Sequence, residues 1–305
     1  MGRTGEGTLA LLEAMRPHQW AKNGFVLAPL IFSRNLLDLS LVALALGAFF
    51  LFSFTASAVY LANDVLDREA DRQHPVKRNR PIASGRLSPR AAWTAASLLC
   101  AGSLLGGLHL GLPFVGILFL YLAMNSLYSL WLKRIAWVDV GTIALGFVLR
   151  VAAGALAIGV AMSHWLFVCT FTVALYLALG KRKHEILAAR HVGEESAKSR
   201  KALDGYSLAH LDWGLRIAGA FAVASYLLYT LAPDTIAKFG TPLLALTVPF
   251  PALGIWSFRT LLSRGSRAQS PTEAILTDAP FLANVAIWLL SVVTILYAAG
   301  LEPTG

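Results

Sequence analysis

The chain reads LVALALGAFFLFSFTASAVYLA at residues 41–62 and continues as NDVLDREADRQHPVKRNR at residues 63–80. The first segment is uncharged and long enough to cross about 30 Å of hydrocarbon as one α-helix. The second segment holds carboxylates and cations in close succession. The junction therefore predicts a membrane-spanning helix that ends in a charged functional site.

Composition places the whole chain in the membrane class. Hydrophobic residues make up 56% of the 305 residues and charged residues only 14%, a balance far from that of an average soluble domain. Apolar runs occupy residues 24–33, 41–62, 91–108, 112–132, 138–160, 164–180, 215–233, 240–262 and 281–300. We expect an all-α integral membrane protein with about nine transmembrane helices, the first of them short, in a single domain over residues 1–305.

The distribution of lysine and arginine predicts the orientation. These residues gather in alternate connections, namely the N-terminal arm and residues 64–90, 133–134, 181–216 and 259–267. The positive-inside rule places the basic connections in the cytoplasm. We therefore expect a multi-pass protein of the plasma (inner) membrane, with the active site facing the cytoplasm and, after an odd number of spans, the C-terminus outside. The first 23 residues carry charges and lack an apolar core, so no cleavable signal peptide is expected.

The formal net charge is +9, which by itself would suit a nucleic-acid partner. The cations lie beside membrane ends, however, and not on a soluble module. We therefore expect no nucleic acid, and the lipid bilayer and phosphorylated substrates are the expected partners.

Asp64, Asp67 and Asp71 have the spacing i, i+3, i+7. If the helix continues through them, all three point from one face. Packed like charges repel, and Mg²⁺ is the natural counter-ion because it takes one or two carboxylates and completes its shell with water and phosphate oxygens. The predicted metal ligands are Asn63, Asp64, Asp67 and Asp71, with the three aspartates as catalytic residues. The alternative is a solvated, mixed-charge loop at a helix end.

Lys77, Arg78 and Arg80 follow directly. Cations beside a metal–carboxylate site suit a substrate with more negative charge than the metal alone offsets, such as a pyrophosphate. Lys22 and Asn23, just before the first apolar run, are predicted to contact phosphate on the same membrane face. Anchoring at the membrane surface is the simpler interpretation of these cations.

A third basic group is Lys181 and Arg182, followed by Glu185. Here the simpler interpretation is a local i, i+4 ion pair between Lys181 and Glu185. The functional interpretation makes both cations phosphate ligands, with Glu185 orienting one of them or a metal. Tyr128 and Lys133, at the end of the run 112–132, are further candidates for substrate contact.

Arg150 lies within an apolar run, about 16 Å along the helix that begins near Asp139. A bare arginine at that depth is costly, so it should face a polar cavity or a buried partner. We expect it to line the wall of the active-site chamber, where it holds a substrate phosphate or ties neighbouring helices together.

These segments carry a family resemblance. Residues 63–71 resemble the NDxxDxxxD motif of the UbiA superfamily of intramembrane prenyltransferases. RPHQWAKN at 16–23, YSLWLKR at 128–134, GKRKHEIL at 180–187 and SPTEAILTDAPFL at 270–282 resemble the polyprenyl-phosphate phosphoribosyltransferase branch. The likeness covers nearly the whole chain. It departs from UbiA-type aromatic prenyltransferases at 181–185, where KRKHE replaces the usual DxxxD pair.

The resemblance implies a UbiA-type bundle with a cytoplasm-facing polar cavity. It also implies Mg²⁺-dependent transfer of 5-phosphoribose from phosphoribosyl pyrophosphate to a polyprenyl (decaprenyl-type) phosphate, with release of pyrophosphate, for cell-envelope biosynthesis. The single acid of KRKHE favours a donor held by one metal site and several cations. The family permits a homo-oligomer.

Two other functions remain open from the sequence. One is an aromatic prenyltransferase with a prenyl diphosphate donor, which shares the first aspartate motif. The other is a transporter or lipid-binding protein, although a transporter more often places ionisable groups near the bilayer midplane.

Overall fold

The computed structural model describes residues 3–192, 205–263 and 271–298, and these form helices joined by turns, with no strand among them. The chain divides into two compact units. Unit 1 comprises residues 1–131 and 149–161, and unit 2 comprises residues 132–148 and 162–305.

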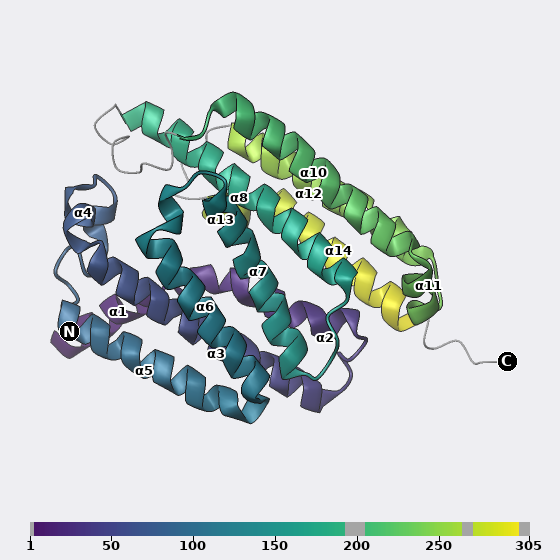
Figure 1. Ribbon diagram of the computed structural model, residues 1–305, viewed down its shortest axis with the longest axis horizontal. Coiled ribbons are helices and arrows are strands. Elements are labelled where there is room, and N and C mark those ends of the chain that lie inside the picture. Colours follow the sequence, from purple (N-terminus) through teal and green to yellow (C-terminus); the bar gives the residue numbers. More distant parts are fainter. Residues whose placement is uncertain (1–2, 193–204, 264–270, 299–305) are drawn as a thin grey trace. The chain divides into compact units, whose positions relative to one another are not determined.

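Unit 1 contains the N-terminal helices, shown from purple to teal in Figure 1. They are α1 (Arg3–Met15), η1 (Pro17–Leu27), α2 (Ala28–Phe32), α3 (Leu39–Leu66), α4 (Arg68–Gln73), η2 (Lys77–Asn79), α5 (Pro89–Gly107), η3 (Leu108–Leu110), α6 (Leu112–Leu130) and the last part of α7 (Val138–Ala157).

Unit 2 contains the remaining elements. They are η4 (Leu132–Arg134), the first part of α7, α8 (His164–Val192), α10 (Leu208–Leu231), α11 (Pro233–Phe239), η6 (Leu243–Thr247), α12 (Pro249–Ser263), α13 (Pro271–Thr277) and α14 (Ala279–Ala298).

Eight of the described helices are long and apolar enough to cross a membrane, which confirms the all-α membrane fold. They correspond to eight of the nine apolar runs. Many of their large apolar side chains are exposed, including Leu98, Leu105, Phe119 and Leu290. An exposed apolar surface of this kind suits helices whose outer faces contact lipid.

The remaining run, residues 24–33, belongs to a broken segment and not to one long helix. Ser57 on α3 donates a hydrogen bond to the carbonyl of Met15, Asn23 donates to Ser53, and Leu30 packs on Ala45. The partners on α3 come earlier in the sequence as the segment advances, so α1, η1 and α2 run antiparallel along α3.

The breaks in this passage have local causes. Arg16 has a left-handed backbone (φ 56°, ψ 59°), which few residues other than glycine adopt and which ends α1. Pro17 then opens η1, and Pro29 lies in the first turn of α2, positions that tolerate a missing N–H.

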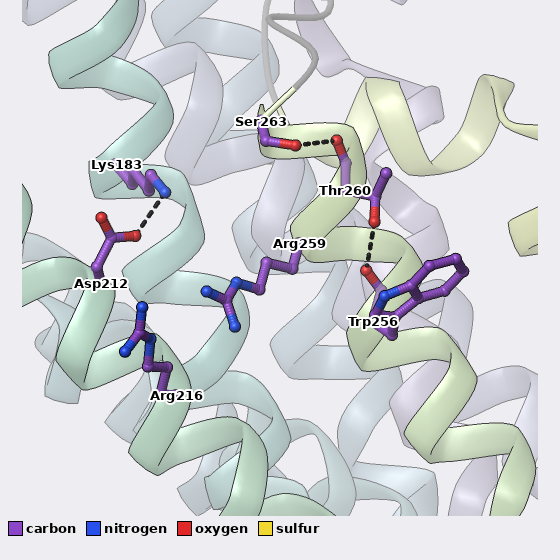
Figure 2. Close-up of a pocket in the computed structure, with 7 residues that line it drawn as sticks. All are labelled: Lys183, Asp212, Arg216, Trp256, Arg259, Thr260 and Ser263. Carbon is purple, nitrogen blue, oxygen red and sulfur yellow. Dashed lines mark hydrogen bonds and ion pairs between the residues drawn. The ribbon is translucent and has the colours of Figure 1, made fainter.

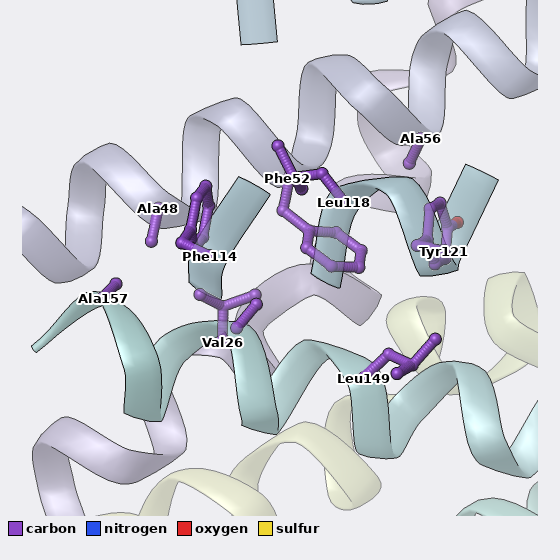
Figure 3. Packing of buried hydrophobic residues seen from close by; sticks show 10 residues of the cluster. Val26, Ala48, Phe52, Ala56, Phe114, Leu118, Tyr121, Leu149 and Ala157 are labelled. Carbon is purple, nitrogen blue, oxygen red and sulfur yellow. The ribbon is translucent and has the colours of Figure 1, made fainter. Parts of the chain in front are cut away.

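The core of unit 1 lies between η1, α3, α6 and the last part of α7. Figure 3 shows Val26, Phe52, Phe114 and Leu118 in this core, all fully buried. A β-carbon on Gly154 would lie 1.8 Å from the carbonyl oxygen of Val26, so only glycine permits this approach of α7 to η1. Unit 2 has its own core, in which Tyr176, Leu211, Leu215 and Phe258 are buried.

Candidate active site

The end of α3 differs from the uninterrupted helix expected from the sequence. α3 stops at Leu66, Asp67 caps it with φ −89° and ψ 6°, and α4 starts at Arg68. The condition under which Asp64, Asp67 and Asp71 were expected to point from one face, a helix that continues through all three, is therefore not met. Asp64 and Asp71 are both only 3% exposed, whereas Asp67 is half-buried.

Asp64 and Asp71 are instead brought together by Arg80. Its Nη1 lies 3.1 Å from Asp64 Oδ1 and 2.6 Å from Asp71 Oδ2, and Nη2 of Arg16 lies 2.6 Å from the same Asp64 oxygen. We refer to Arg16, Asp64, Asp71 and Arg80 as the Asp64 cluster. Two carboxylates and two guanidinium groups balance in charge, which limits the cost of burying the acids.

The Asp64 cluster contains a donor set that fits Mg²⁺. Asp64 Oδ1 and Asp71 Oδ2 both contact Nη1 of Arg80, so both carboxylates face the position that this cationic group occupies. No group of three metal-binding side chains converges within the described residues. The two aspartates thus suit a Mg²⁺ that takes its remaining ligands from water and substrate phosphate. A metal here would take the place of Arg80 between the acids.

The loop after α4 presents the cations predicted to bind phosphate. Lys77 is half-buried and Arg78 is exposed in η2, next to Arg80. Arg86 holds this loop to α1, because its side chain donates to the carbonyl of Asn79 at 2.8 Å and to both carboxylate oxygens of Glu13. The hydrogen bond from Arg86 lowers the pKa of the Glu13 carboxyl, so this pair stays ionised near neutral pH.

Arg150 is buried, at 6% exposure, with polar and aromatic neighbours in unit 1. Its Nε donates to Asn23 Oδ1 at 2.8 Å, and its Nη2 donates to the Tyr121 hydroxyl at 3.2 Å. The guanidinium also lies over the rings of Phe52 and Tyr121. Arg150 therefore ties η1, α3, α6 and α7 together, as one of its two expected roles requires.

Asn23 does not open onto a surface in this arrangement. It is 1% exposed, accepts from Arg150 and donates to Ser53 at 2.9 Å. Contact with a substrate phosphate would require this network to open. The neighbouring Lys22 is half-buried, and its Nζ donates to Gln19 Oε1 at 2.5 Å.

Asn63 and Tyr128 lie at the facing ends of α3 and α6. Ser129 donates a hydrogen bond to Asn63 Oδ1 at 2.9 Å and so joins the two helices. Tyr128, one residue earlier, is half-buried. In unit 2, Lys133 is half-buried in η4. The substrate contacts of Tyr128 and Lys133 stay predictions.

In unit 2, a second group of charges surrounds Arg182. Its side chain, 1% exposed, bonds to the carboxylates of Asp139 on α7 and Glu185 on α8. Tyr206 donates to Asp139 and accepts from the backbone N–H of Trp137 at 2.7 Å. We refer to Asp139, Arg182, Glu185 and Tyr206 as the Arg182 cluster.

The carboxylates of the Arg182 cluster are occupied by hydrogen-bond and ion-pair partners within the protein. Glu185 orients Arg182, as expected for one of its two functional roles, while Lys181 is half-buried nearby on α8. Burial raises the pKa of the Tyr206 hydroxyl above its usual range, and its hydrogen bond to Asp139 raises that pKa further. Tyr206 therefore stays protonated and acts as a donor to Asp139.

Three residues of these clusters were not among the predicted site residues. Arg16, Asp139 and Tyr206 are far in sequence from their partners, so no local spacing reveals them. Of the three, Asp139 could have been suspected from the sequence, because an acid near the start of an apolar run must find a partner.

Comparison with known proteins agrees with the family resemblance seen in the sequence. The model of the UbiA prenyltransferase family matches residues 24–269. The decaprenyl-phosphate phosphoribosyltransferase of Corynebacterium glutamicum is 33% identical over 304 residues, which cover 94% of this chain and 86% of that protein. The protein of the same name from Mycolicibacterium smegmatis is 36% identical over 228 residues, covering 73% of this chain and 71% of that protein.

Solved structures share the fold. A UbiA homologue from Archaeoglobus fulgidus, bound to DMAPP and Mg²⁺, has a TM-score of 0.68 at 17% identity and covers 94% of this chain and 98% of that one. The digeranylgeranylglyceryl phosphate synthase structure has a TM-score of 0.64 at 18% identity, with coverage of 96% and 99%.

Proposed function

Because the chain belongs to the UbiA prenyltransferase family, we propose that this membrane-embedded transferase moves a 5-phosphoribosyl group from phosphoribosyl pyrophosphate to a polyprenyl phosphate. The relatives named decaprenyl-phosphate phosphoribosyltransferase support this branch, since the likeness extends over most of both chains. The active site faces the cytoplasm of the plasma membrane in this proposal, as the basic connections indicate.

The observation that carries the proposal is the Asp64 cluster at the end of α3. Two buried carboxylates share one arginine nitrogen there, and further cations follow in the adjoining loop. Asp64 and Asp71 would hold Mg²⁺, with Asp67 and Asn63 beside them. When bound, the metal neutralises the negative charge that develops on a pyrophosphate leaving group.

The protein's own groups account for the rest of the reaction. A lipid-phosphate oxygen forms a bond to the anomeric carbon, and the bond from that carbon to pyrophosphate breaks, with its electron pair leaving on pyrophosphate. Arg80, released from the aspartates, joins Lys77 and Arg78 in binding the donor phosphates. The acceptor phosphate already carries negative charge, so it needs positioning and no strong general base.

Lys181 and Arg182 on α8 supply further phosphate-binding groups in this proposal. Lys181 is half-buried, while Asp139 and Glu185 hold the Arg182 side chain in one orientation. A fixed guanidinium loses little conformational entropy when it binds an anion.

An aromatic prenyltransferase is the second candidate, favoured by the NDxxDxxxD motif and by the fold of the Archaeoglobus homologue. Two acids, Asp139 and Glu185, do meet in the Arg182 cluster, but both are bonded to Arg182. A second metal site there would first have to displace a buried guanidinium, which favours the phosphoribosyl donor.

Two reactions of the purified protein with Mg²⁺ separate these candidates. In the first, labelled phosphoribosyl pyrophosphate and decaprenyl phosphate should give a labelled lipid and an equal amount of pyrophosphate. In the second, a prenyl diphosphate and 4-hydroxybenzoate should give no prenylated product. Product only in the second reaction would replace the proposal with the prenyltransferase.

A further inference from the structure

A cavity of about 400 Å³ opens in unit 2 between α8, α10 and α12, and its described lining contains no residue of the Arg182 cluster. Its wall contains Lys183, Arg216 and Arg259, and the carboxylate of Asp212 is its one acid among the described lining residues. Figure 2 shows the guanidinium groups of Arg216 and Arg259 pointing into the space between α10 and α12. We refer to this cavity as the Arg216 pocket.

The Arg216 pocket has an excess of positive charge that the described part of the chain does not neutralise. Lys183 pairs with Asp212 at 2.6 Å. Within residues 3–192, 205–263 and 271–298, no ion pair forms at Arg216 or Arg259, although Arg216 lies over the ring of Trp213 at 5.3 Å. Three cations and one acid therefore leave a site that suits a singly or doubly charged anion.

The cavity continues into an apolar groove. A second space of about 220 Å³ shares Arg216, Trp256 and Arg259 with the first, and its remaining wall includes Leu215, Ala220, Ala252 and Ile255. Small side chains on α10 and α12 keep the groove open. A charged end and an adjoining apolar groove match an amphiphile with an anionic head.

The position of the pocket suits a molecule that lies in the bilayer. Arg216 is about 12 Å along α10 from its start at Leu208, so its charge falls within a predicted membrane span. Trp213 and Trp256 are 61% and 67% exposed, and exposed tryptophans mark the level of lipid headgroups. An exposed arginine at the level of the lipid headgroups is stabilised most by a lipid phosphate at the same depth.

We propose that the Arg216 pocket binds one anionic phospholipid of the surrounding membrane. Arg216 and Arg259 hold the lipid phosphate, and one acyl chain lies along the groove between α10 and α12. Lys183 is neutralised and held by Asp212, which leaves the net positive charge on Arg216 and Arg259. This lipid is separate from the substrates of the proposed transfer reaction.

Native mass spectrometry of the detergent-solubilised protein tests this binding without Mg²⁺, donor or turnover. Dioleoyl phosphatidylglycerol should bind as one tight molecule, at least about 10-fold more tightly than dioleoyl phosphatidylcholine. The double substitution Arg216→Gln/Arg259→Gln should weaken phosphatidylglycerol binding by about 10-fold or more. Arg90→Gln, at an exposed arginine near the start of α5, is the matched control and should bind like the unmodified protein.

A second variant tests the groove without changing charge. Ala252→Leu should weaken binding of the dioleoyl lipid while leaving the binding of short-chain dihexanoyl phosphatidylglycerol unchanged. Gel filtration confirms that each variant is folded.

Several results would overturn the proposal. These are equal binding of both headgroups, equal binding by the double variant, or the same loss in Arg90→Gln. Displacement of the lipid by excess inorganic phosphate would identify a free-phosphate site instead. Displacement by an equimolar amount of decaprenyl phosphate would identify an acceptor site.

Discussion

Arg16 and Arg80 both form ion pairs with Oδ1 of the buried Asp64. The same Arg80 nitrogen, Nη1, also forms an ion pair with Asp71. The acids are therefore balanced in charge by arginines, and in the proposed function the same cations would bind the donor's pyrophosphate. In the proposed reaction a metal would compete with the arginines for one pair of carboxylates, and a released arginine could then bind the donor phosphates. This exchange would couple metal binding to substrate binding.

Asp64→Asn and Asp71→Asn should each lower the turnover number by about 100-fold or more, because an amide cannot supply the charge that Mg²⁺ requires. Radiolabelled transfer with purified protein measures the effect. Glu69→Gln is the matched control, since Glu69 lies on α4 between Asp64 and Asp71 in sequence but is 74% exposed and, among the described residues, forms ion pairs with neighbouring arginines alone. Full activity in the Asp64 variant would remove this carboxylate from the mechanism.

Arg150→Leu should lower the free energy of unfolding, because Asn23 and Tyr121 would lose a buried donor. Each polar group left without a partner costs about 1–3 kcal/mol. Thermal denaturation in detergent measures the change, and Tyr121→Phe, which removes only the weaker hydrogen bond, should cost less. A lipid-facing arginine would behave in the opposite way, so a more thermostable and fully active Arg150→Leu protein would contradict its buried role.

At the scale of elements, glycine decides how closely α7 approaches η1. Gly154→Ala places a β-carbon 1.8 Å from a backbone oxygen, and backbone cannot rotate away as a side chain can. We expect a loss of about 1–3 kcal/mol in unfolding free energy, the usual cost of overpacking. Gly47→Ala on α3, where a β-carbon would meet nothing within 4 Å, should be neutral or slightly stabilising. Equal melting temperatures of the two variants would show that α7 is free to move outward.

The two cations at the end of the apolar part of α8 should behave differently. Lys181→Ala should raise the Michaelis constant for one substrate by about 10-fold, with an unchanged melting temperature. Arg182→Ala should lower the melting temperature as well, because it leaves the buried Asp139 and the half-buried Glu185 without their shared cation. Steady-state kinetics and thermal melts of both variants separate the roles, and identical behaviour of the two would argue against a structural role for Arg182.

At the scale of the whole molecule, eight of the described helices are long enough to cross a membrane, and we expect the broken segment along α3 to be a ninth passage. Nine passages would place the two ends of the chain on opposite sides. A fluorescent-protein fusion at the N-terminus should be bright in the cytoplasm, and alkaline phosphatase fused at the C-terminus should be active outside it. Activity of alkaline phosphatase at both ends, or at neither, would mean that the broken segment does not cross.

The sequence by itself determined the class of fold and the apolar runs that become the eight long helices, because apolar length is a property of neighbouring residues. The site at the end of α3 stays a prediction from local spacing. The tertiary structure alone decided that Arg16 and Arg80 lie on Asp64, that Asp139 and Tyr206 complete the environment of Arg182, and that Arg150 meets Asn23. These partners are distant in sequence, and helix periodicity orients side chains only along one helix. A buried charge must find an opposite charge or a hydrogen-bonding group, but which one it finds depends on how the helices pack.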